Sequence, residues 1–222
     1  MSFIVAIDGP AGTGKSTLTK LISKELNLVN IDTGATYRCV ALKSIKNNIK
    51  LEEKEKIINL LNDINIEFKN EENLQKVFLD GEDVTERIRQ NDVNGIVSPI
   101  SSIKEVRFKL VDLQRKLAEG KNVIMEGRDI TTYVFPNADV KIYLDASIEE
   151  RAKRRLAQNL EKGIETSYDE VYENIRSRDE NDKAKEVGAL KIAEDAIVID
   201  TTNLIIEEVK EKIINEIKKK LK

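Results

Sequence analysis

The sequence predicts an α/β fold, in which a parallel sheet is covered by helices on both faces. Two observations carry this prediction. Short continuous apolar runs, typical of strands buried on both faces of a sheet, alternate along the chain with segments of helical periodicity. The first apolar run, from Phe3 to Ile7, also ends in a glycine-rich turn that leads directly into a helical pattern. Strand, glycine loop and helix form the opening of a βαβ unit.

The next elements follow in order from local signals. A short second strand is predicted at 28–31, and the segment 32–34 ends it. Two helices are predicted after it, at 35–46 and 52–61.

Residues 64–84 have a different character. Apolar residues alternate with polar ones from Ile64 to Phe68, which is the pattern of a half-buried strand. A later apolar run ends at Asp80-Gly81, a strong hairpin signal. This segment therefore predicts a small antiparallel sheet inserted into an otherwise α/β chain.

The second half of the chain returns to alternating strands and helices. The predicted strands lie at 122–126, 141–145 and 196–200, and the predicted helices at about 102–119, from 147 onward and at 204–221. Ser147 followed by Glu150 matches a capping box, which marks a helix start. The segment from about 151 to 190 is strongly charged and weakly apolar, which predicts an exposed, mobile element.

Composition excludes several kinds of chemistry. The chain has 222 residues, with one cysteine and no histidine. An internal disulfide, a cysteine zinc cluster, and catalysis by Ser-His-Asp or Cys-His groups are therefore excluded. Phosphoryl transfer is one large class of reaction that needs none of these groups. The length favours one large domain, or one domain with inserts.

Charge and hydropathy limit the partners. The formal net charge is −3, so the chain is a poor general nucleic-acid binder, although several arginines could still converge on a small anion. No apolar run approaches the roughly 18 residues that span a bilayer, and no signal-peptide pattern stands at the N-terminus. We therefore expect no nucleic-acid partner, no membrane partner and a cytoplasmic location.

The strongest motif is a phosphate-binding loop. Residues 9–16 fit G-x-x-x-x-G-K-[ST] between a predicted strand and a predicted helix. Backbone N–H groups of such a loop wrap a phosphate, helped by the helix N-terminus. Lys15 is predicted to reach the β- and γ-phosphates, and Ser16 to bind Mg²⁺. The predicted ATP-binding residues are Gly9, Pro10, Ala11, Gly12, Thr13, Gly14, Lys15, Ser16 and Thr17.

A phosphate loop alone leaves three classes open: a small-molecule kinase, a GTPase switch, and an ATP-driven motor. Residues 92–95 fit the short GTPase pattern D-x-x-G, but no N-K-x-D element follows anywhere in the chain. The length argues against a motor without excluding it.

Two arginines favour the kinase class. Arg38 lies shortly after the second predicted strand, and Arg128 shortly after the third. Ligands of open parallel sheets bind beyond the carboxyl ends of the strands, so both arginines are expected at the edge that carries the phosphate loop. Guanidinium groups bind phosphate bidentately, which indicates a second anion. The alternative is that each arginine pairs with an acidic neighbour such as Asp32 or Asp129.

These motifs together carry a family resemblance. I-D-G-P-A-G-T-G-K-S-T, D-T-G-A-T-Y-R, G-E-D-V-T-E-x-I-R at 81–89 and E-G-R-D resemble bacterial cytidylate kinases. The resemblance continues through F-P-N-A at 135–138, K-I-Y-L-D-A-S-x-E-E-R-A-K-R-R at 141–155 and A-I-V-I-D-T-T at 196–202, so that it covers nearly the whole chain.

The resemblance implies a single domain with a P-loop core at 1–60, 96–150 and 190–222, an antiparallel NMP-binding insert at about 62–95, and a helical lid at about 151–189. It implies transfer of the γ-phosphoryl group of ATP to CMP or dCMP with Mg²⁺, by a monomer. The residues that match catalytic positions are Lys15, Arg128, Arg154 and Arg155. Those that match CMP-binding positions are Thr33, Tyr37, Arg38, Ser98, Arg107, Arg128, Asp129, Arg178, Asp182 and Lys185.

The resemblance also assigns roles within these sets. Arg38 and Arg128 match arginines that hold the CMP phosphate. Cytosine recognition falls to Ser98, Arg107 and Asp129, whereas Arg178 and Asp182 match lid residues near the CMP sugar and phosphates. The alternative for Arg154 and Arg155 is pairing with Glu149 or Glu150 on a solvated helix.

Three positions depart from the family pattern. Lys185 stands where an arginine is usual, and it keeps the charge but loses the bidentate fork. Ala189 replaces a common proline, and Thr131 stands where a glycine is common after the Arg-Asp pair. The charged 151–190 segment is expected to close over the nucleotides, because water in the site would hydrolyse ATP.

Overall fold

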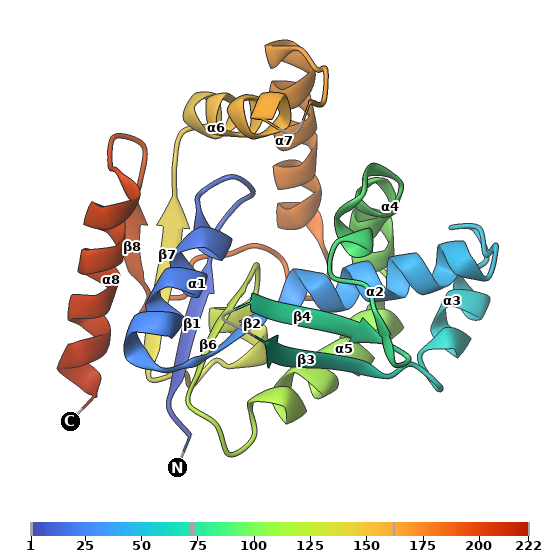
Figure 1. The fold of residues 1–222 in the computed structure, drawn as a ribbon, viewed down its shortest axis with the longest axis horizontal. Coiled ribbons are helices and arrows are strands. Elements are labelled where there is room, and N and C mark those ends of the chain that lie inside the picture. Colours follow the sequence, from blue (N-terminus) through green and yellow to red (C-terminus); the bar gives the residue numbers. More distant parts are fainter. Residues whose placement is uncertain (1, 72–73, 162, 222) are drawn as a thin grey trace. The chain divides into compact units, whose positions relative to one another are not determined.

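The computed structural model describes residues 2–71, 74–161 and 163–221. The chain divides into two compact units (Figure 1). The first consists of Met1–Val29 and Gly120–Lys222, and the second of Asn30–Glu119. Within the described residues, no helix is long and apolar enough to cross a membrane.

A parallel sheet forms the centre of the first unit. Its strand order is β2-β6-β1-β7-β8. The strands are β1 (Ile4–Asp8), β6 (Val123–Gly127), β7 (Val140–Asp145) and β8 (Ile197–Asp200), with β2 (Val29–Asp32) beginning where the unit ends. β1 pairs in parallel with both β6 and β7, and β8 pairs in parallel with β7. The predicted core strands are confirmed, each within about one residue of its predicted bounds.

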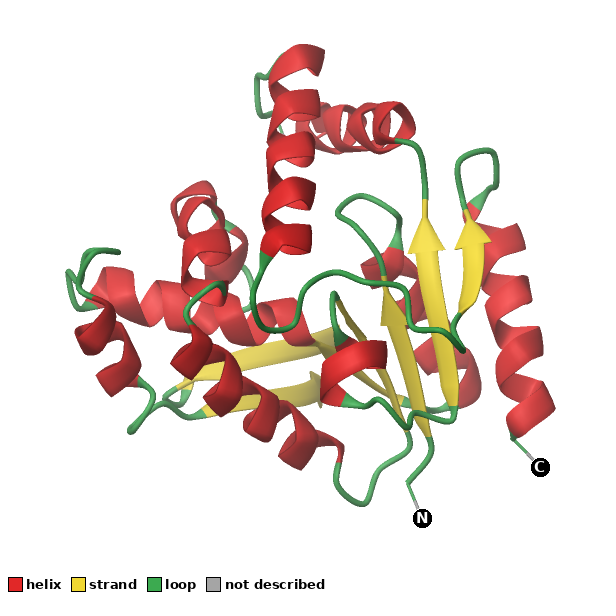
Figure 2. Ribbon diagram, turned by 180° about the vertical axis from the view of Figure 1, so that it is seen from behind, coloured by secondary structure: helices red, strands yellow, loops and turns green. Residues whose placement is uncertain are grey.

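Two helices cover one face of this sheet. They are α1 (Lys15–Leu26) and α8 (Ile206–Lys220). Ile7, Ile142 and Leu144 of the strands pack with Leu18 of α1 and Ile213 of α8, and all five side chains are buried. Figure 2 shows these strands side by side, with their carboxyl ends toward the same edge. The phosphate loop leaves β1 at this edge, which is where such sheets bind ligands.

A pair of helices follows β7 beyond the same edge of the sheet (Figures 1 and 2). These helices are α6 (Ile148–Glu161) and α7 (Tyr168–Ala184). They pack on each other through a small apolar cluster centred on Ala152, Val171 and Ile175. The Ser147 hydroxyl accepts the Glu150 N–H at 3.3 Å, so the predicted start of α6 is confirmed.

The second unit contains the predicted antiparallel insert. Its elements are α2 (Thr33–Lys46), α3 (Lys54–Leu60), β3 (Ile66–Glu71), β4 (Leu74–Leu79), β5 (Glu82–Asp83), a 3₁₀ turn (Arg87–Arg89), α4 (Asn91–Ser101) and α5 (Lys104–Ala118). β3, β4 and β5 form an antiparallel sheet. Asp80 and Gly81 join β4 to β5 with positive φ angles of 52° and 87°, as the predicted hairpin requires.

Three local features differ from the sequence-based expectation. Helix α2 begins at Thr33, two residues early, because the Asp32 carboxylate accepts the Ala35 N–H and caps it. Helix α4 was not predicted, since it contains Gly95 and Pro99. A π-helical turn at Ile130–Val134 was also not predicted.

Candidate active site

The phosphate loop leaves β1 through a backbone that only glycine adopts without strain. Gly9 has a φ of +147°, and a Cβ there would lie 2.0 Å from the carbonyl oxygen of Leu144. Gly12 has a φ of +85°, and a Cβ there would lie 3.0 Å from Cβ of Arg151. The glycines of the motif are therefore required by close approach to β7 and α6 as well as by the turn.

Lys15 lies inside this loop with 5% of its surface exposed. Its ammonium donates to the carbonyl oxygens of Gly9 and Pro10, at 2.6 Å each, and to Oγ1 of Thr13 at 3.2 Å. Burial, together with the positive charge of Arg128, lowers the pKa of Lys15 well below its usual value, whereas Glu126 and Asp8 oppose that shift. The ammonium is thus held where a phosphate can share it.

Ser16 and Glu126 meet at the start of α1. The Ser16 hydroxyl donates to Oε2 of Glu126 at 2.9 Å, and the Thr19 hydroxyl donates to Oε1 of the same residue at 3.4 Å. Glu126 is the last residue but one of β6 and is 5% exposed. A hydroxyl and a carboxylate are oxygen ligands of the kind that Mg²⁺ prefers. The sequence analysis predicted Ser16 here but missed Glu126, which was quoted only as part of E-G-R-D.

No cluster of three or more Cys, Asp or Glu side chains capable of holding a metal occurs among the described residues. A Mg²⁺ ion that takes most of its ligands from nucleotide phosphates and water needs no such cluster. The Ser16–Glu126 pair therefore fits a nucleotide-bound Mg²⁺.

Arg128 is held by a carboxylate from α7. Its Nε donates to Oδ2 of Asp182 at 2.8 Å, and Lys185 donates to the other oxygen of Asp182 at 2.7 Å. Burial alone would raise the pKa of Asp182, but Arg128 and Lys185 outweigh it and lower that pKa to about 2. The positive charge of Arg178 also lowers the pKa of Asp182. Arg128 thus pairs with Asp182 of α7, a partner that the sequence-based alternative, which named Asp129, did not anticipate.

Arg151 is a residue that the sequence analysis missed. It is 5% exposed, and it donates to the carbonyl oxygen of Ala11 in the phosphate loop at 3.1 Å and to Asp179 of α7 at 2.6 Å. It therefore connects the phosphate loop with both α6 and α7. Its place in the E-E-R-A-K-R-R run was the available signal, but three arginines in that run made the buried one impossible to select.

The two predicted lid arginines have different surroundings. Arg154 pairs with Glu150 at 3.0 Å and donates to the carbonyl oxygen of Thr201 at 2.7 Å, which matches the ion-pair alternative stated above. Arg155 is exposed on α6.

The first unit thus brings several predicted site residues to one end of its sheet. Lys15 is within electrostatic range of Arg128 and Arg178, and Asp182 interacts with Arg128, Arg178 and Lys185. Thr17 is exposed at the start of α1, and Asp129 is buried directly after β6.

In the second unit, Asp32 organises two arginines. Nη2 of Arg38 lies 2.6 Å from Oδ2 of Asp32, and Nη2 of Arg89 lies 3.6 Å from the same oxygen. Burial would raise the pKa of Asp32, but Arg38 and Arg89 lower it below its usual value. Sequence reasoning missed Arg89, although it ends the quoted G-E-D-V-T-E-x-I-R segment.

Arg107 occupies the interior of the second unit. It is 2% exposed, donates to the carbonyl oxygen of Ser101 at 3.1 Å, and lies over the Tyr37 ring at 5.5 Å from the centroid. The carbonyl oxygen of Ser98 accepts a hydrogen bond from the Ser101 hydroxyl, one helical turn later. Thr33 is buried at the start of α2. The structure therefore groups Tyr37, Arg107 and the end of α4 within this unit.

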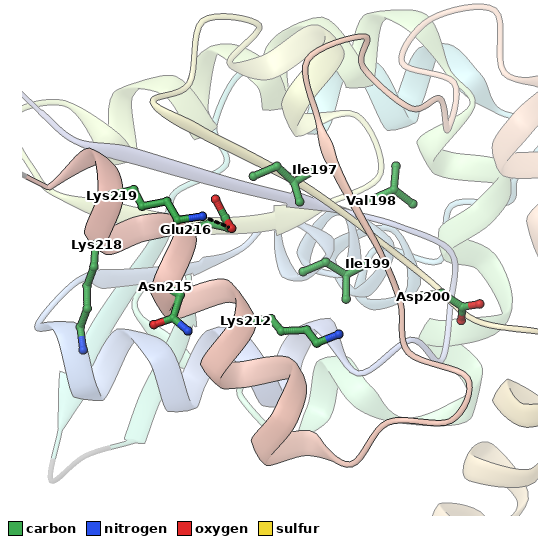
Figure 3. A pocket seen from close by; sticks show the side chains of 9 residues that line it. All are labelled: Ile197, Val198, Ile199, Asp200, Lys212, Asn215, Glu216, Lys218 and Lys219. Carbon is green, nitrogen blue, oxygen red and sulfur yellow. Dashed lines mark hydrogen bonds and ion pairs between the residues drawn. The ribbon is translucent and has the colours of Figure 1, made fainter.

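A groove of about 970 Å³ lies along β8 and α8 of the first unit (Figure 3). It is lined by Ile197, Val198, Ile199, Asp200, Lys212, Asn215, Glu216, Lys218 and Lys219. None of the predicted site residues is among these lining residues.

Two solved structures with a similar fold carry kinase names. A gluconokinase from Sinorhizobium meliloti has a TM-score of 0.51 at 11% identity, with 98% of this chain and 92% of that one covered. A shikimate kinase from Bacteroides thetaiotaomicron has a TM-score of 0.50 at 13% identity, with 97% and 98% covered. At these identities the likeness shows the fold alone, and it confirms the predicted α/β class.

Sequence comparison is more specific. A protein named cytidylate kinase from Caldicellulosiruptor bescii is 52% identical over 210 residues, which cover 95% of this chain and 93% of the relative. Another of that name, from Fusobacterium nucleatum, is 49% identical over 220 residues and covers 99% of this chain and 97% of the relative. The sequence profile of cytidylate kinase matches residues 5–219. The chain therefore belongs to the cytidylate kinase family.

Proposed function

We propose that this chain is a (d)CMP kinase, which transfers the γ-phosphoryl group of ATP to CMP or dCMP and yields CDP or dCDP together with ADP. The observation that carries the proposal is the match to cytidylate kinases over almost the whole chain, which extends through the phosphate loop and the residues predicted for the acceptor. The enzyme is a phosphotransferase of pyrimidine nucleotide metabolism.

On the donor side, we assign the ATP phosphates to the loop of residues 9–17. Its inward N–H groups and the N-terminus of α1 supply positive potential without a formal charge. Lys15 adds a full charge that is buried and already directed into the loop by three oxygen acceptors. An incoming γ-phosphate would replace those weaker acceptors with an ionic one.

We assign Mg²⁺ to the Ser16 hydroxyl, with Glu126 close by on β6. When bound, the ion would neutralise negative charge on the β- and γ-phosphates. Glu126 orients the Ser16 hydroxyl through the 2.9 Å hydrogen bond between them.

On the acceptor side, we assign the CMP phosphate to Arg38 and Arg128. Each is held in place by a carboxylate, Asp32 or Asp182 respectively, so its guanidinium has a fixed direction and spare donors. As the family resemblance implies, cytosine recognition is assigned to Ser98, Arg107 and Asp129, and the sugar and phosphates to Arg178 and Asp182. Thr33, Tyr37 and Lys185 are assigned to CMP binding without a narrower role.

The chemical step needs little covalent participation by the protein. An oxygen of the CMP phosphate attacks the γ-phosphorus, a new P–O bond forms, and the bond from the γ-phosphorus to the bridging oxygen breaks to release ADP. The attacking oxygen is already anionic, so no general base is required. Lys15, Arg128 and the arginines of α6 lower the barrier by neutralising charge on the transferring group.

We further propose that the charged helices α6 and α7 form the lid over ATP, with Arg154 and Arg155 facing its phosphates in the closed state. The Arg151–Asp179 ion pair, with its hydrogen bond to Ala11, supports this assignment because it already links the helices to the phosphate loop.

We also propose a cytoplasmic monomer whose partners are ATP, CMP and dCMP. The net charge of −3 supports the absence of a nucleic-acid partner. Light scattering coupled to size exclusion tests the oligomeric state, since a mass near 25.2 kDa is expected.

The proposed activity is tested by ADP release from Mg-ATP with CMP, dCMP, UMP, AMP and GMP offered in parallel. Turnover with CMP and dCMP above the other acceptors is expected. Turnover with another acceptor alone would keep the kinase and overturn the base assignments. ATP binding without turnover on any acceptor would overturn the kinase and favour a nucleotide-dependent switch.

A further inference from the structure

A buried carboxylate joins the base of the phosphate loop to the segment that follows Arg128 and Asp129. Asp8 is the last residue of β1 and is fully buried. Its Oδ1 accepts the Ile130 N–H at 2.9 Å. Its Oδ2 accepts both the N–H of Thr131, at 2.7 Å, and the Thr131 hydroxyl, at 2.6 Å.

The two joined segments carry different parts of the proposed reaction. Gly9, the first residue of the ATP-binding loop, follows Asp8 directly. Arg128 and Asp129, assigned to the acceptor phosphate and to cytosine, directly precede Ile130. Asp8 therefore spans the donor and acceptor groups of this unit within a few residues on either side.

The receiving segment has an unusual backbone. Residues 130–134 form a π-helical turn, in which Val134 N–H donates to the Asp129 carbonyl at 3.0 Å and Phe135 N–H donates to that of Ile130 at 2.8 Å. Isolated π turns are unfavourable and occur often at functional sites. Here the turn is anchored by a residue more than 120 positions away in the chain, so local sequence alone does not maintain it.

We propose that Thr131 is a positioning residue, whose hydroxyl locks the Asp8 carboxylate and so fixes Arg128 and Asp129 relative to the phosphate loop. This inference rests on the proposed function, since it concerns the alignment of CMP with ATP. Glycine, the residue that is common here in similar sequences, has no hydroxyl to offer. Thr131 donates through both its backbone and its side chain, which fixes its backbone and its χ1 together.

The test compares Thr131→Val with Thr131→Ser. Valine keeps the shape and removes the hydroxyl, whereas serine keeps the hydroxyl. We expect Thr131→Val to lower kcat/KM for CMP by about tenfold, because a hydrogen bond to a buried charged group is lost. The KM for ATP should change by less than about twofold, because the loop itself keeps its contacts. Thr131→Ser should restore kcat/KM for CMP.

Thr202→Val is the matched control. Thr202 donates to Asp200 through its N–H at 2.8 Å and through its hydroxyl at 2.5 Å, the same pair of threonine donors on an aspartate, but at an exposed and local site in the same unit. Its hydroxyl also accepts the Ser147 N–H at 3.0 Å. Its removal should leave kcat/KM for CMP unchanged. Equal losses in the Thr131→Val and Thr202→Val variants, or a Thr131→Ser variant as impaired as Thr131→Val, would overturn the proposal.

Hydrogen exchange supplies a readout that does not depend on activity. The amides of Ile130 and Thr131 should exchange about tenfold faster in Thr131→Val, as the carboxylate that accepts them loses its third donor. Unchanged exchange would overturn the proposal that the Thr131 hydroxyl fixes this segment. Failure of wild-type protein to phosphorylate CMP would overturn the proposed function, whereas the exchange result would still decide whether Thr131 fixes this segment.

Discussion

At the scale of single residues, three buried or partly buried arginines of the candidate site each have a carboxylate that fixes their direction. Asp32 holds Arg38, Asp182 holds Arg128, and Asp179 holds Arg151. Such pairs contribute little net stability, because desolvation offsets much of the Coulombic attraction. Their value lies in geometry: a guanidinium with one edge bound keeps its other donors oriented for a phosphate.

Lys15 provides the sharpest prediction at this scale. Lys15→Met should lower kcat/KM by at least about 100-fold, because the variant loses a preorganised charge that stabilises the transition state. The melting temperature should change little, because burial lowers the pKa of Lys15 and relief from that buried charge offsets the hydrogen bonds that the ammonium makes. Lys20→Met, on the exposed side of the same helix, is the matched control and should retain full activity. A Lys15→Met variant with normal turnover would contradict the assignment of the loop.

A second prediction concerns Lys185, which stands where the family pattern usually has an arginine. Its ammonium is nearly buried and donates to Asp182 at 2.7 Å, beside the guanidinium of Arg128. Lys185→Met should destabilise the fold by about 1–3 kcal/mol, because Asp182 loses a charged donor, and should raise the KM for CMP. Lys185→Arg should stay within about threefold of wild type in kcat/KM.

Denaturant unfolding measures the loss of stability, and steady-state kinetics measure the change in KM. The control is Lys183→Met, which changes an exposed lysine nearby. If Lys185→Met matched that control in both measurements, Lys185 would have no role at Asp182.

At the scale of elements, the sequence was informative wherever a local pattern decides the structure. Apolar runs predicted the strands, and Asp80-Gly81 predicted the β4–β5 hairpin. Helix α4 escaped prediction because Gly95 and Pro99 disfavour it locally, whereas burial of Val93, Val97 and Ile100 on one face stabilises it. Tertiary packing, which a single sequence does not display, decided that element.

Sequence reasoning selected candidate site residues by type but not by pairing. The loop motif pointed to Lys15 and Ser16, and the strand ends pointed to Arg38 and Arg128. Arg128 pairs with Asp182, which is 54 positions away in the chain. Asp8 anchors the turn after Asp129, more than 120 positions away. No periodicity or motif carries such long-range information.

The lid prediction belongs to the same scale. Helices α6 and α7 bury a small cluster of their own and attach to the phosphate loop mainly through Arg151. ATP and CMP together should therefore slow amide exchange in α6 and α7, because the helices gain contacts with the phosphates. Exchange in α8, packed on the sheet, should stay constant and serves as the internal control. Unchanged exchange in α6 and α7 with both nucleotides bound would rule out a closing lid.

At the scale of the whole molecule, nearly balanced charge conceals opposite behaviour of two buried carboxylates. Asp182 faces Arg128 and Lys185, and its pKa falls to about 2. Burial raises the pKa of Asp8 to about 6, because its hydrogen-bond donors, at Thr131 and Ile130, are neutral groups that only partly compensate for lost hydration. The stability of the chain therefore depends on pH with different signs in two ranges.

Asp182 contributes stability that is complete above the ordinary aspartate pKa of 3.8 and is lost as pH falls toward 2. Asp8 acts in the opposite sense. Its folded pKa of about 6 lies above the value of 3.8 in the unfolded chain, so the folded state binds the proton more tightly. Its contribution to stability is therefore present at low pH and is lost as pH rises through about 6.

The free energy of unfolding should accordingly rise between pH 8 and pH 4 by up to about 3 kcal/mol on account of Asp8, and fall again below pH 4 as Asp182 is protonated. Asp8→Asn should flatten the upper part of this profile, since an amide does not titrate there, whereas Asp63→Asn, at an exposed position, should leave it unchanged. Urea unfolding at one-unit pH intervals measures the difference between variant and wild type, which isolates Asp8 from every other titrating group. A pH-independent difference would mean that Asp8 keeps an ordinary pKa, and that the donors at Ile130 and Thr131 compensate fully for its burial.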